Sequence, residues 1–173
     1  MAGILVYVEA RDNVVLPITF ELLAAARSLA KAGLGEVICC VAAADTAPLT
    51  SQLKGADGIL TVQHPSLSPY HPEAHGHVLR AAAEHCKPNV VLVAYNSSGT
   101  DLGAALAVQC DYAMIGYCTA IESGDGGIKT TSQLYGGKLV AKAKSVLPTV
   151  VAMVPGSYDE ENGKKGGSAV VEA

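Results

Sequence analysis

The chain has 173 residues, a length that fits one domain and suffices to bury a hydrophobic core. Half of the residues are hydrophobic, only 5% are aromatic, and the formal net charge is −4. This composition argues against a nucleic-acid surface, which needs a basic patch or stacking aromatic side chains, and against binding to an anionic membrane. No apolar run approaches the roughly 20 residues that span a bilayer.

The first residues and the cysteines indicate where the protein works. The N-terminus leads directly into an apolar strand, without the basic region and cleavage site of a secretory signal. The five cysteines show no CxxC spacing, and Cys39 and Cys40 are adjacent in an apolar strand, so their side chains should point to opposite faces. We therefore expect buried thiols in a reducing compartment and a cytoplasmic location.

Apolar strands alternate with helical segments along the first two thirds of the chain. Nearly continuous apolar runs predict strands over residues 4–10, 35–43, 58–62, 88–95 and 113–118. Apolar residues at helical spacing and helix-start signals predict helices over residues 17–33, 50–54, 72–87 and 96–110. This alternation predicts an α/β fold with an open, mostly parallel sheet and helices on both faces.

The pattern changes after Cys118. Segments with period-2 alternation are broken by glycine-rich turns, which predicts an antiparallel hairpin near the C-terminus. In "LYGGK" we expect Gly136 and Gly137 to take positive φ in a tight turn. Residues 147–155 then supply one more buried strand, and residues 158–173 read as a polar tail or linker.

One turn has the position of a ligand site. Residues 96–103, "NSSGTDLG", follow a buried strand and open a helix, and ligands of open parallel sheets bind at such strand ends. The alternative is ordinary capping, with Ser98 or Thr100 as the N-cap and an acidic residue favoured by the helix dipole. The candidate binding residues are Glu9, at the end of the first strand, and Ser98, Gly99, Thr100 and Asp101.

Other functional motifs are missing from the sequence. It contains no GxGxxG after the first strand, and the "GGK" at Gly136–Lys138 lacks the remaining features of a phosphate loop. His71 and His75 are four residues apart, but Pro72 and Gly76 disturb the helix start, so we expect a solvated helix rather than a metal site. No catalytic residues are predicted, because no nucleophile elbow and no acid/base pair is recognisable.

Five segments in the same order resemble a known family. They are "ILVYVEARDNVVLPITFELLAAARSLA", "GADGILTV", "PNVVLVAYNSSGTDLGAALA", "AMIGYCTAIE" and "LYGGKLVAKAK…PTVVAMVPGSY". Their order and spacing are similar to those of the N-terminal domain of the electron-transfer flavoprotein alpha subunit, over about residues 4–158. We therefore expect such a domain over residues 1–157, followed by the tail.

The resemblance implies a Rossmann-like fold of the adenine-nucleotide-binding type and a heterodimer with a beta subunit, which holds AMP or, in bifurcating members, a second FAD. It also implies electron transfer from dehydrogenases to acceptors such as quinone oxidoreductases. In that family the electron-carrying FAD sits in a C-terminal domain of the alpha subunit, which we expect to be absent from this chain. The resemblance thus implies a scaffold in an electron carrier rather than a bond-making enzyme. The residues leave two alternatives open, a stand-alone adenine-nucleotide-binding module and a self-associating module without flavin.

The chain departs from the family pattern at three arginine positions. The family has arginine where this sequence has Ala105, Ser132 and Val154. The loss of three guanidinium groups removes fixed charge and bidentate donors. It argues against a standard contact with the flavin domain or its phosphates, and it favours a divergent or stand-alone form.

Overall fold

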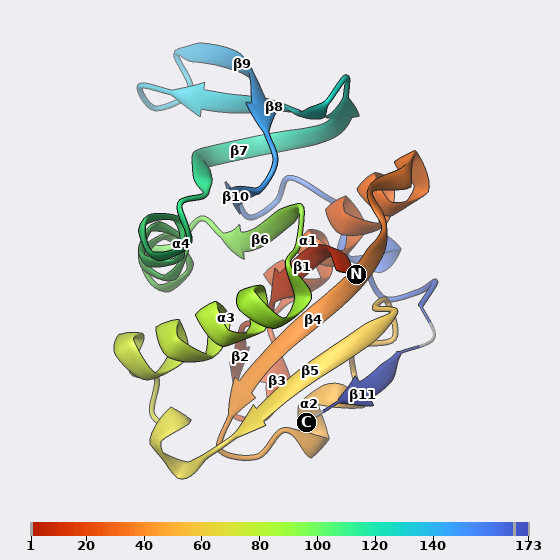
Figure 1. Cartoon of the computed structure of the whole chain (residues 1–173), viewed down its shortest axis with the longest axis vertical. Coiled ribbons are helices and arrows are strands. Elements are labelled where there is room, and N and C mark those ends of the chain that lie inside the picture. The colour runs from red at the N-terminus through yellow and green to blue at the C-terminus, as the bar shows by residue number, and fades with distance from the viewer. Residues whose placement is uncertain (1, 168, 173) are drawn as a thin grey trace.

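The computed structural model describes residues 2–167 and 169–172. One nine-stranded sheet has the order β11-β5-β4-β1-β6-β10-β7-β8-β9 (Figure 1). The strands from β11 to β7 are parallel, and β8 and β9 are antiparallel. The bounds are β1 Ala2–Tyr7, β4 Glu36–Ala43, β5 Gly58–Gln63, β6 Val90–Ala94, β7 Ala113–Gly124, β8 Gly127–Leu134, β9 Leu139–Val146, β10 Thr149–Met153 and β11 Val170–Glu172. The predicted α/β class and the antiparallel addition are confirmed.

Helices lie on both faces of this sheet. Their bounds are α1 Pro17–Leu29, α2 Ala47–Thr50, α3 Pro72–Cys86 and α4 Ser97–Cys110, with short turns η1 Ala30–Leu34, η2 Pro65–Leu67 and η3 Glu160–Asn162. The longest of the four, α3, has 15 residues, and none of the helices in the described residues has the length and apolar character of a membrane span.

The central strands are apolar because both of their faces are covered. All residues of β6 and β10 are buried, and β1 pairs in parallel with β4 on one side and β6 on the other. Strand β10 is inserted between β6 and β7 rather than added at an edge. Near-continuous apolar runs are typical of such doubly covered strands.

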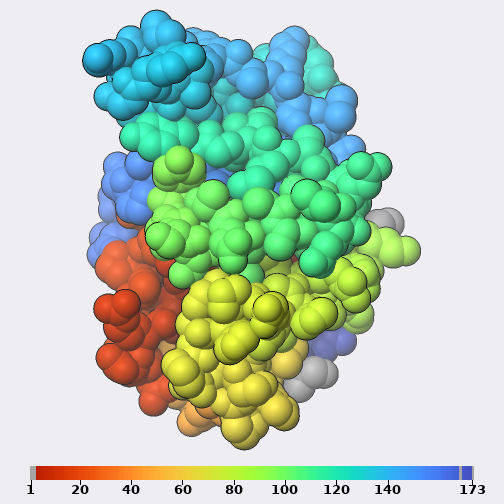
Figure 2. Space-filling view, turned by 90° about the vertical axis from the view of Figure 1, so that its left-hand side faces the viewer, coloured from red at the N-terminus to blue at the C-terminus, as the bar shows by residue number. Residues whose placement is uncertain are grey.

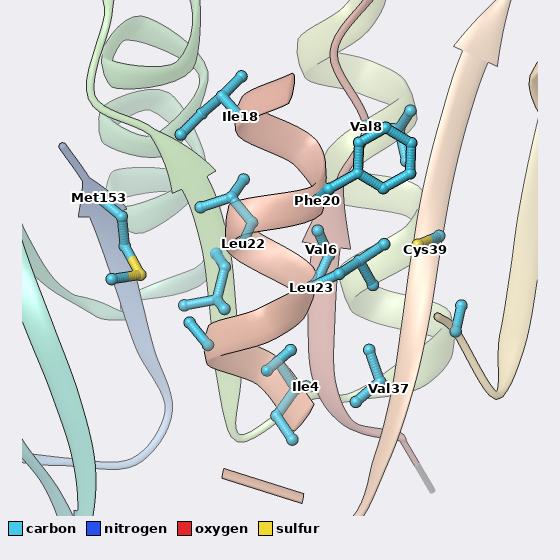
Figure 3. Close-up of a cluster of buried hydrophobic side chains, with 14 of the residues drawn as sticks. Ile4, Val6, Val8, Ile18, Phe20, Leu22, Leu23, Val37, Cys39 and Met153 are labelled. Carbon is cyan, nitrogen blue, oxygen red and sulfur yellow. The ribbon is translucent and has the colours of Figure 1, made fainter. Parts of the chain in front are cut away.

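Two hydrophobic cores result, one on each face. Helix α1 places Leu22 and Leu23 over the sheet beside Ile4 (Figure 3). Helices α3 and α4 cover the opposite face with a separate cluster. Cys39 belongs to the first core and Cys40 to the second, each at most 1% exposed, so the predicted opposite orientation of these thiols is confirmed.

Several element boundaries differ from the sequence prediction; the strand that begins at residue 113, for example, extends to Gly124 rather than Cys118. The first strand ends at Tyr7 rather than at residue 10, because β2 (Ala10–Arg11) turns back to pair with β3 (Val14–Val15). Asp12 and Asn13 form the connection with φ of 51° and 63°, the conformation of a two-residue hairpin turn. The short helix expected over residues 50–54 lies earlier, at α2, where Pro48 occupies its first turn.

The antiparallel part is a meander of β7, β8 and β9 that extends away from the helices (Figure 1). Between β8 and β9, Tyr135, Gly136 and Gly137 all have positive φ, of 51°, 66° and 84°. The predicted glycine turn is therefore confirmed. The return strand begins at Leu139, one residue later than expected.

The segment expected to be a tail packs against the rest of the domain. Tyr158 donates its hydroxyl hydrogen to the Ile121 carbonyl at 3.3 Å, and β11 pairs in parallel with β5. Gly163 lies so close to α1 that a Cβ there would be 1.8 Å from the Phe20 carbonyl oxygen. Residues 158–172 thus include an edge strand of the sheet and a close backbone crossing, which short polar segments do not reveal in sequence.

Candidate functional site

The candidate site lies at the topological switch point of the sheet, where successive strands are placed on opposite sides of β1. From β1, the chain adds β4 and β5 on one side and β6 on the other. Open α/β sheets bind ligands in the crevice beyond the strand ends at this switch point. Glu9 follows the end of β1, and Asn96 follows the end of β6. Figure 2 looks onto this edge, where the yellow loop before α3 lies beside the green start of α4.

The side chains of Glu9 and Asn96 contact each other directly at this switch point. The Asn96 amide nitrogen donates to both carboxylate oxygens of Glu9, at 3.1 and 2.8 Å. The Glu9 backbone is fixed by Thr19, whose hydroxyl accepts from the Glu9 N–H at 3.0 Å and donates to its carbonyl at 3.2 Å. Glu9 is only 8% exposed, and this burial raises the pKa of its carboxyl, while the Asn96 hydrogen bonds partly offset the rise.

Asn96 is also the N-cap of α4. Its side-chain oxygen accepts from the Gly99 N–H at 2.8 Å, and its carbonyl oxygen accepts from the Thr100 N–H at 3.0 Å. The expectation that Ser98 or Thr100 caps the helix is therefore wrong, because both lie inside the first turn. Asn96 has the extended backbone that a cap requires, with φ of −139°.

The structure brings some of the candidate binding residues together. Glu9 reaches Gly99 through Asn96, and a Cβ at Gly99 would lie 2.2 Å from the Ala94 carbonyl, so only glycine fits there. Ser98 and Thr100 are half-buried on the first turn, and Asp101 is exposed. Whether any of these residues binds a ligand stays a prediction. Sequence reasoning missed Asn96, although an asparagine directly after a buried strand and three residues before a glycine is a cap signal.

A buried histidine, His75, links the end of β1 to the loop before α3 on the same side of the sheet. His75 is 5% exposed, and its Nδ1 lies 2.6 Å from the Tyr7 hydroxyl, while its Nε2 lies 3.1 Å from the Leu67 carbonyl oxygen. A carbonyl only accepts, so Nε2 carries the hydrogen and the Tyr7 hydroxyl donates to Nδ1. Burial lowers the pKa of His75, so the neutral ring fits this arrangement.

Tyr70 extends this cluster toward α4. Its ring packs against the His75 ring with centroids 4.8 Å apart, and the side chain is 41% exposed. Burial raises the pKa of Tyr70, a hydrogen bond with Ser98 counters the rise, and the charges of Asp101 and Glu9 add to it. The edge therefore combines tyrosine hydroxyls with carboxylates.

This arrangement does not suit an anionic ligand. The Gly99 N–H group, one of the first-turn donors that a phosphate could use at a helix start, already donates to the Asn96 side chain. The Glu9 carboxyl lies beside this helix start through its contact with Asn96, and Asp101 adds a second acidic group, so the local charge disfavours an anion. The side chains of Glu9 and Asn96 at the switch point thus pair with each other.

The histidines do not assemble a ligand set. His71 pairs with Glu73 at 3.3 Å on the surface, whereas His75 points into the protein. Within residues 2–167 and 169–172, no group of three or more His, Cys, Asp or Glu side chains is placed to hold a metal ion.

The fold is that of the doubly wound, Rossmann-like α/β class, with an antiparallel extension. Comparison with known families defines it further. The family described as Electron transfer flavoprotein domain matches residues 4–173, and the chain belongs to this family.

Curated relatives carry consistent names. The chain is 28% identical over 153 residues to the Electron transfer flavoprotein subunit alpha of Bacillus subtilis (strain 168), covering 87% of this chain and 46% of that protein. It is 31% identical over 144 residues to the subunit of the same name from Megasphaera elsdenii, covering 81% and 43%. Protein FixB of Clostridium saccharobutylicum is 26% identical over 166 residues, covering 92% and 49%. The chain spans about half the length of these relatives.

Proposed function

We propose that this chain is an alpha-subunit-like scaffold domain of an electron-transfer flavoprotein. It pairs with a beta subunit in a complex that carries electrons from dehydrogenases to an acceptor, in the cytoplasm. Family membership and relatives named electron-transfer flavoprotein subunit alpha support the electron-transfer role. The observation that carries the scaffold role is the contact between Glu9 and Asn96.

That contact bears directly on the cofactors of the family. A flavin or adenine nucleotide would need free donors for its phosphates, and the first-turn N–H group of Gly99 is already occupied. The occupied Gly99 N–H and the neighbouring Glu9 carboxyl both support a nucleotide site elsewhere in the complex. We propose that any FAD or AMP of the complex is held outside this crevice.

The meander offers a surface for the beta subunit. Strand β9 is the outermost strand of the sheet, and Leu139, Val140 and Val146 are 55%, 63% and 74% exposed. Exposed apolar side chains along an unpaired strand edge are typical of a contact with another chain. Lys142 and Lys144 on the same strand disfavour pairing of two copies, which supports a different subunit over the self-associating alternative.

Co-expression with the beta subunit from the same organism tests this proposal. Size-exclusion chromatography with light scattering should give a one-to-one heterodimer. Val140→Lys should weaken the heterodimer roughly tenfold, because it removes apolar contact area from β9. Val108→Lys is the matched control, since Val108 is 85% exposed on α4 and should leave pairing unchanged. A chain that stays alone, or that forms only homodimers, would overturn the proposal.

Calorimetric titration tests the absence of a nucleotide in the crevice. The isolated chain should be colourless, and AMP, ATP and FAD should give neither binding heat nor a shift in melting temperature. Stoichiometric FAD in the purified chain, or micromolar binding of AMP, would instead favour the stand-alone nucleotide-binding module.

A further inference from the structure

Two strands at one edge of the sheet, β5 and β11, lack a helical cover on the face that α3 occupies. On this face α3 packs on β1 and β4, and α4 packs on β6, β7 and β10. Within the described residues, neither helix packs substantially on β5 or β11, and no helix lies in front of these two strands in Figure 1. In a doubly wound sheet, helices normally cover both faces of such strands.

A groove follows this uncovered region between α3 and β11. It consists of two hollows of about 490 and 210 Å³, which share Leu60, His85 and Glu172 in their linings. We name it the α3–β11 groove. Val62 and Val170 line it and are 41% and 72% exposed, so apolar surface remains in contact with water there.

The shape of the groove suits a helix. Its wall on α3 includes Ala81 and Ala82, small residues that allow another helix to approach within the usual 8–10 Å between axes. Its floor follows β5 from Gly58 to Val62, a length of about 13 Å at roughly 3.3 Å per residue. That length accommodates between two and three helical turns of about 5.4 Å each.

The margins of the groove are acidic. Glu36 and Glu172 line it, whereas none of the described lining residues is Lys or Arg. Asp57 also lines it, but its carboxylate pairs with Arg27 at 2.8 Å. The remaining positive partner is His85, 4.0 Å from Glu172 and charged only when protonated. Two carboxylates therefore stay available to basic side chains of a ligand.

We propose that the α3–β11 groove binds an amphipathic helix of a partner protein, apolar on one face and lined by Lys or Arg at its margins. The apolar face covers Leu60, Val62 and Val170, and the basic margins meet Glu36 and Glu172. A second copy of this chain is a poor occupant, because the chain carries a net charge of −4 and the groove needs basic side chains. The groove lies at the other end of the sheet from β9, so this inference is independent of pairing with a beta subunit.

A designed peptide provides the probe. It is a fluorescent helix of about five turns with Leu and Ala on one face and Lys on the other, compared with a peptide that has Glu at every Lys position. In fluorescence anisotropy the Lys peptide should bind at least about tenfold more tightly than the Glu peptide. Hydrogen exchange should slow in α3 and β5 of the complex, and not in β9.

Neighbouring valines on β11 give a matched pair of variants. Val170→Lys should weaken binding of the Lys peptide about tenfold, because it places a like charge in the groove. Val171→Lys should leave binding unchanged, since residue 171 points to the other face of the strand and does not line the groove. Both positions are more than half exposed, so both variants should fold, as thermal melting will verify.

Three outcomes would overturn the inference. Equal weakening by Val170→Lys and Val171→Lys would reduce the effect to general attraction to an acidic protein. Absence of binding by the Lys peptide would show that the groove does not accept a helix. Protection confined to β11, with preference for an extended peptide, would replace the helix with an added strand.

Discussion

The hydroxyl of Tyr7 lies 2.6 Å from Nδ1 of His75 and joins the end of β1 to helix α3. The other ring nitrogen of His75 donates to the Leu67 carbonyl oxygen, so the ring also fixes the loop before α3. The arrangement fits a neutral imidazole, because protonation would put a hydrogen on both nitrogens and reverse the direction of the bond to the Tyr7 hydroxyl.

This geometry predicts a loss of stability at acidic pH. Burial lowers the pKa of His75, and the charge of neighbouring His71 lowers it further, so the unfolded chain binds this proton before the folded one. The free energy of unfolding is therefore fully retained above pH 6.5 and falls as the pH drops toward the folded pKa. The largest loss in the free energy of unfolding is about 1.4 kcal/mol for each unit by which the unfolded pKa exceeds the folded pKa.

Urea unfolding of wild type and His75→Gln, at about pH 7.5 and about pH 5.5, checks this prediction. Glutamine keeps a donor and an acceptor but does not titrate, so the wild type should lose more stability than the variant. Glu9 contributes in the opposite direction, since its raised pKa adds stability toward low pH, and it is present in both proteins. Identical pH dependence of the two proteins would contradict the role of His75.

The contact between Glu9 and Asn96 predicts a second stability effect. Asn96→Ala removes the helix cap and leaves a buried carboxyl without its donors, which should cost about 2 kcal/mol or more. Ser97→Ala, one residue later at an exposed position, should cost less than about 0.5 kcal/mol. Denaturant unfolding measures both.

A double variant separates the two roles of Asn96. Asn96→Asp keeps a capping oxygen but brings a second carboxyl against Glu9, and Glu9→Gln should recover most of that loss. A cost for Asn96→Ala no larger than that for Ser97→Ala would show that the contact contributes nothing to stability.

The backbone at Gly163 passes very close to helix α1, and we predict that this close approach holds the edge strand β11 in place. Gly163→Ala forces a Cβ to within 1.8 Å of the Phe20 carbonyl oxygen, which is backbone and cannot turn away. The crossing should lift, and β5 amides that β11 protects should exchange faster with solvent. Lys165→Ala, at an exposed position of the same segment, should leave the exchange unchanged. Equal exchange in both variants would mean that residues 158–172 act as a free linker after all.

Much of the fold could be predicted because it depends on local patterns. The strands β6 and β10, which are covered on both faces, are continuous apolar runs. The turn at Gly136 and Gly137 is recognisable because glycine is the residue that adopts positive φ most readily. The burial of His75 had a signal that went unused, since His75, Val78, Leu79 and Ala82 are spaced as one helical face.

The rest depends on contacts between distant residues. Glu9 and Asn96 are 87 positions apart, and their side chains meet only because β1 and β6 are neighbours in the sheet. Strand β11 joins β5 through backbone hydrogen bonds, and its three residues follow a glycine-rich segment that looks like a linker. Neither composition nor periodicity encodes such pairings.

The missing arginine at Ser132 gives the last prediction. Ser132 is 7% exposed, and its hydroxyl donates to the Gly116 carbonyl oxygen at 3.1 Å. Ser132→Arg would place a guanidinium in this buried space opposite Cys118, and it should lower the free energy of unfolding by about 2 kcal/mol or more. Gln133→Arg is the control, because Gln133 is exposed on the other face of β8 and should tolerate the same side chain. Equal stability of the two variants, measured by denaturant unfolding, would show that this chain retains room for the arginine of its family. A selective loss would instead show that packing between β7 and β8 has adapted to serine.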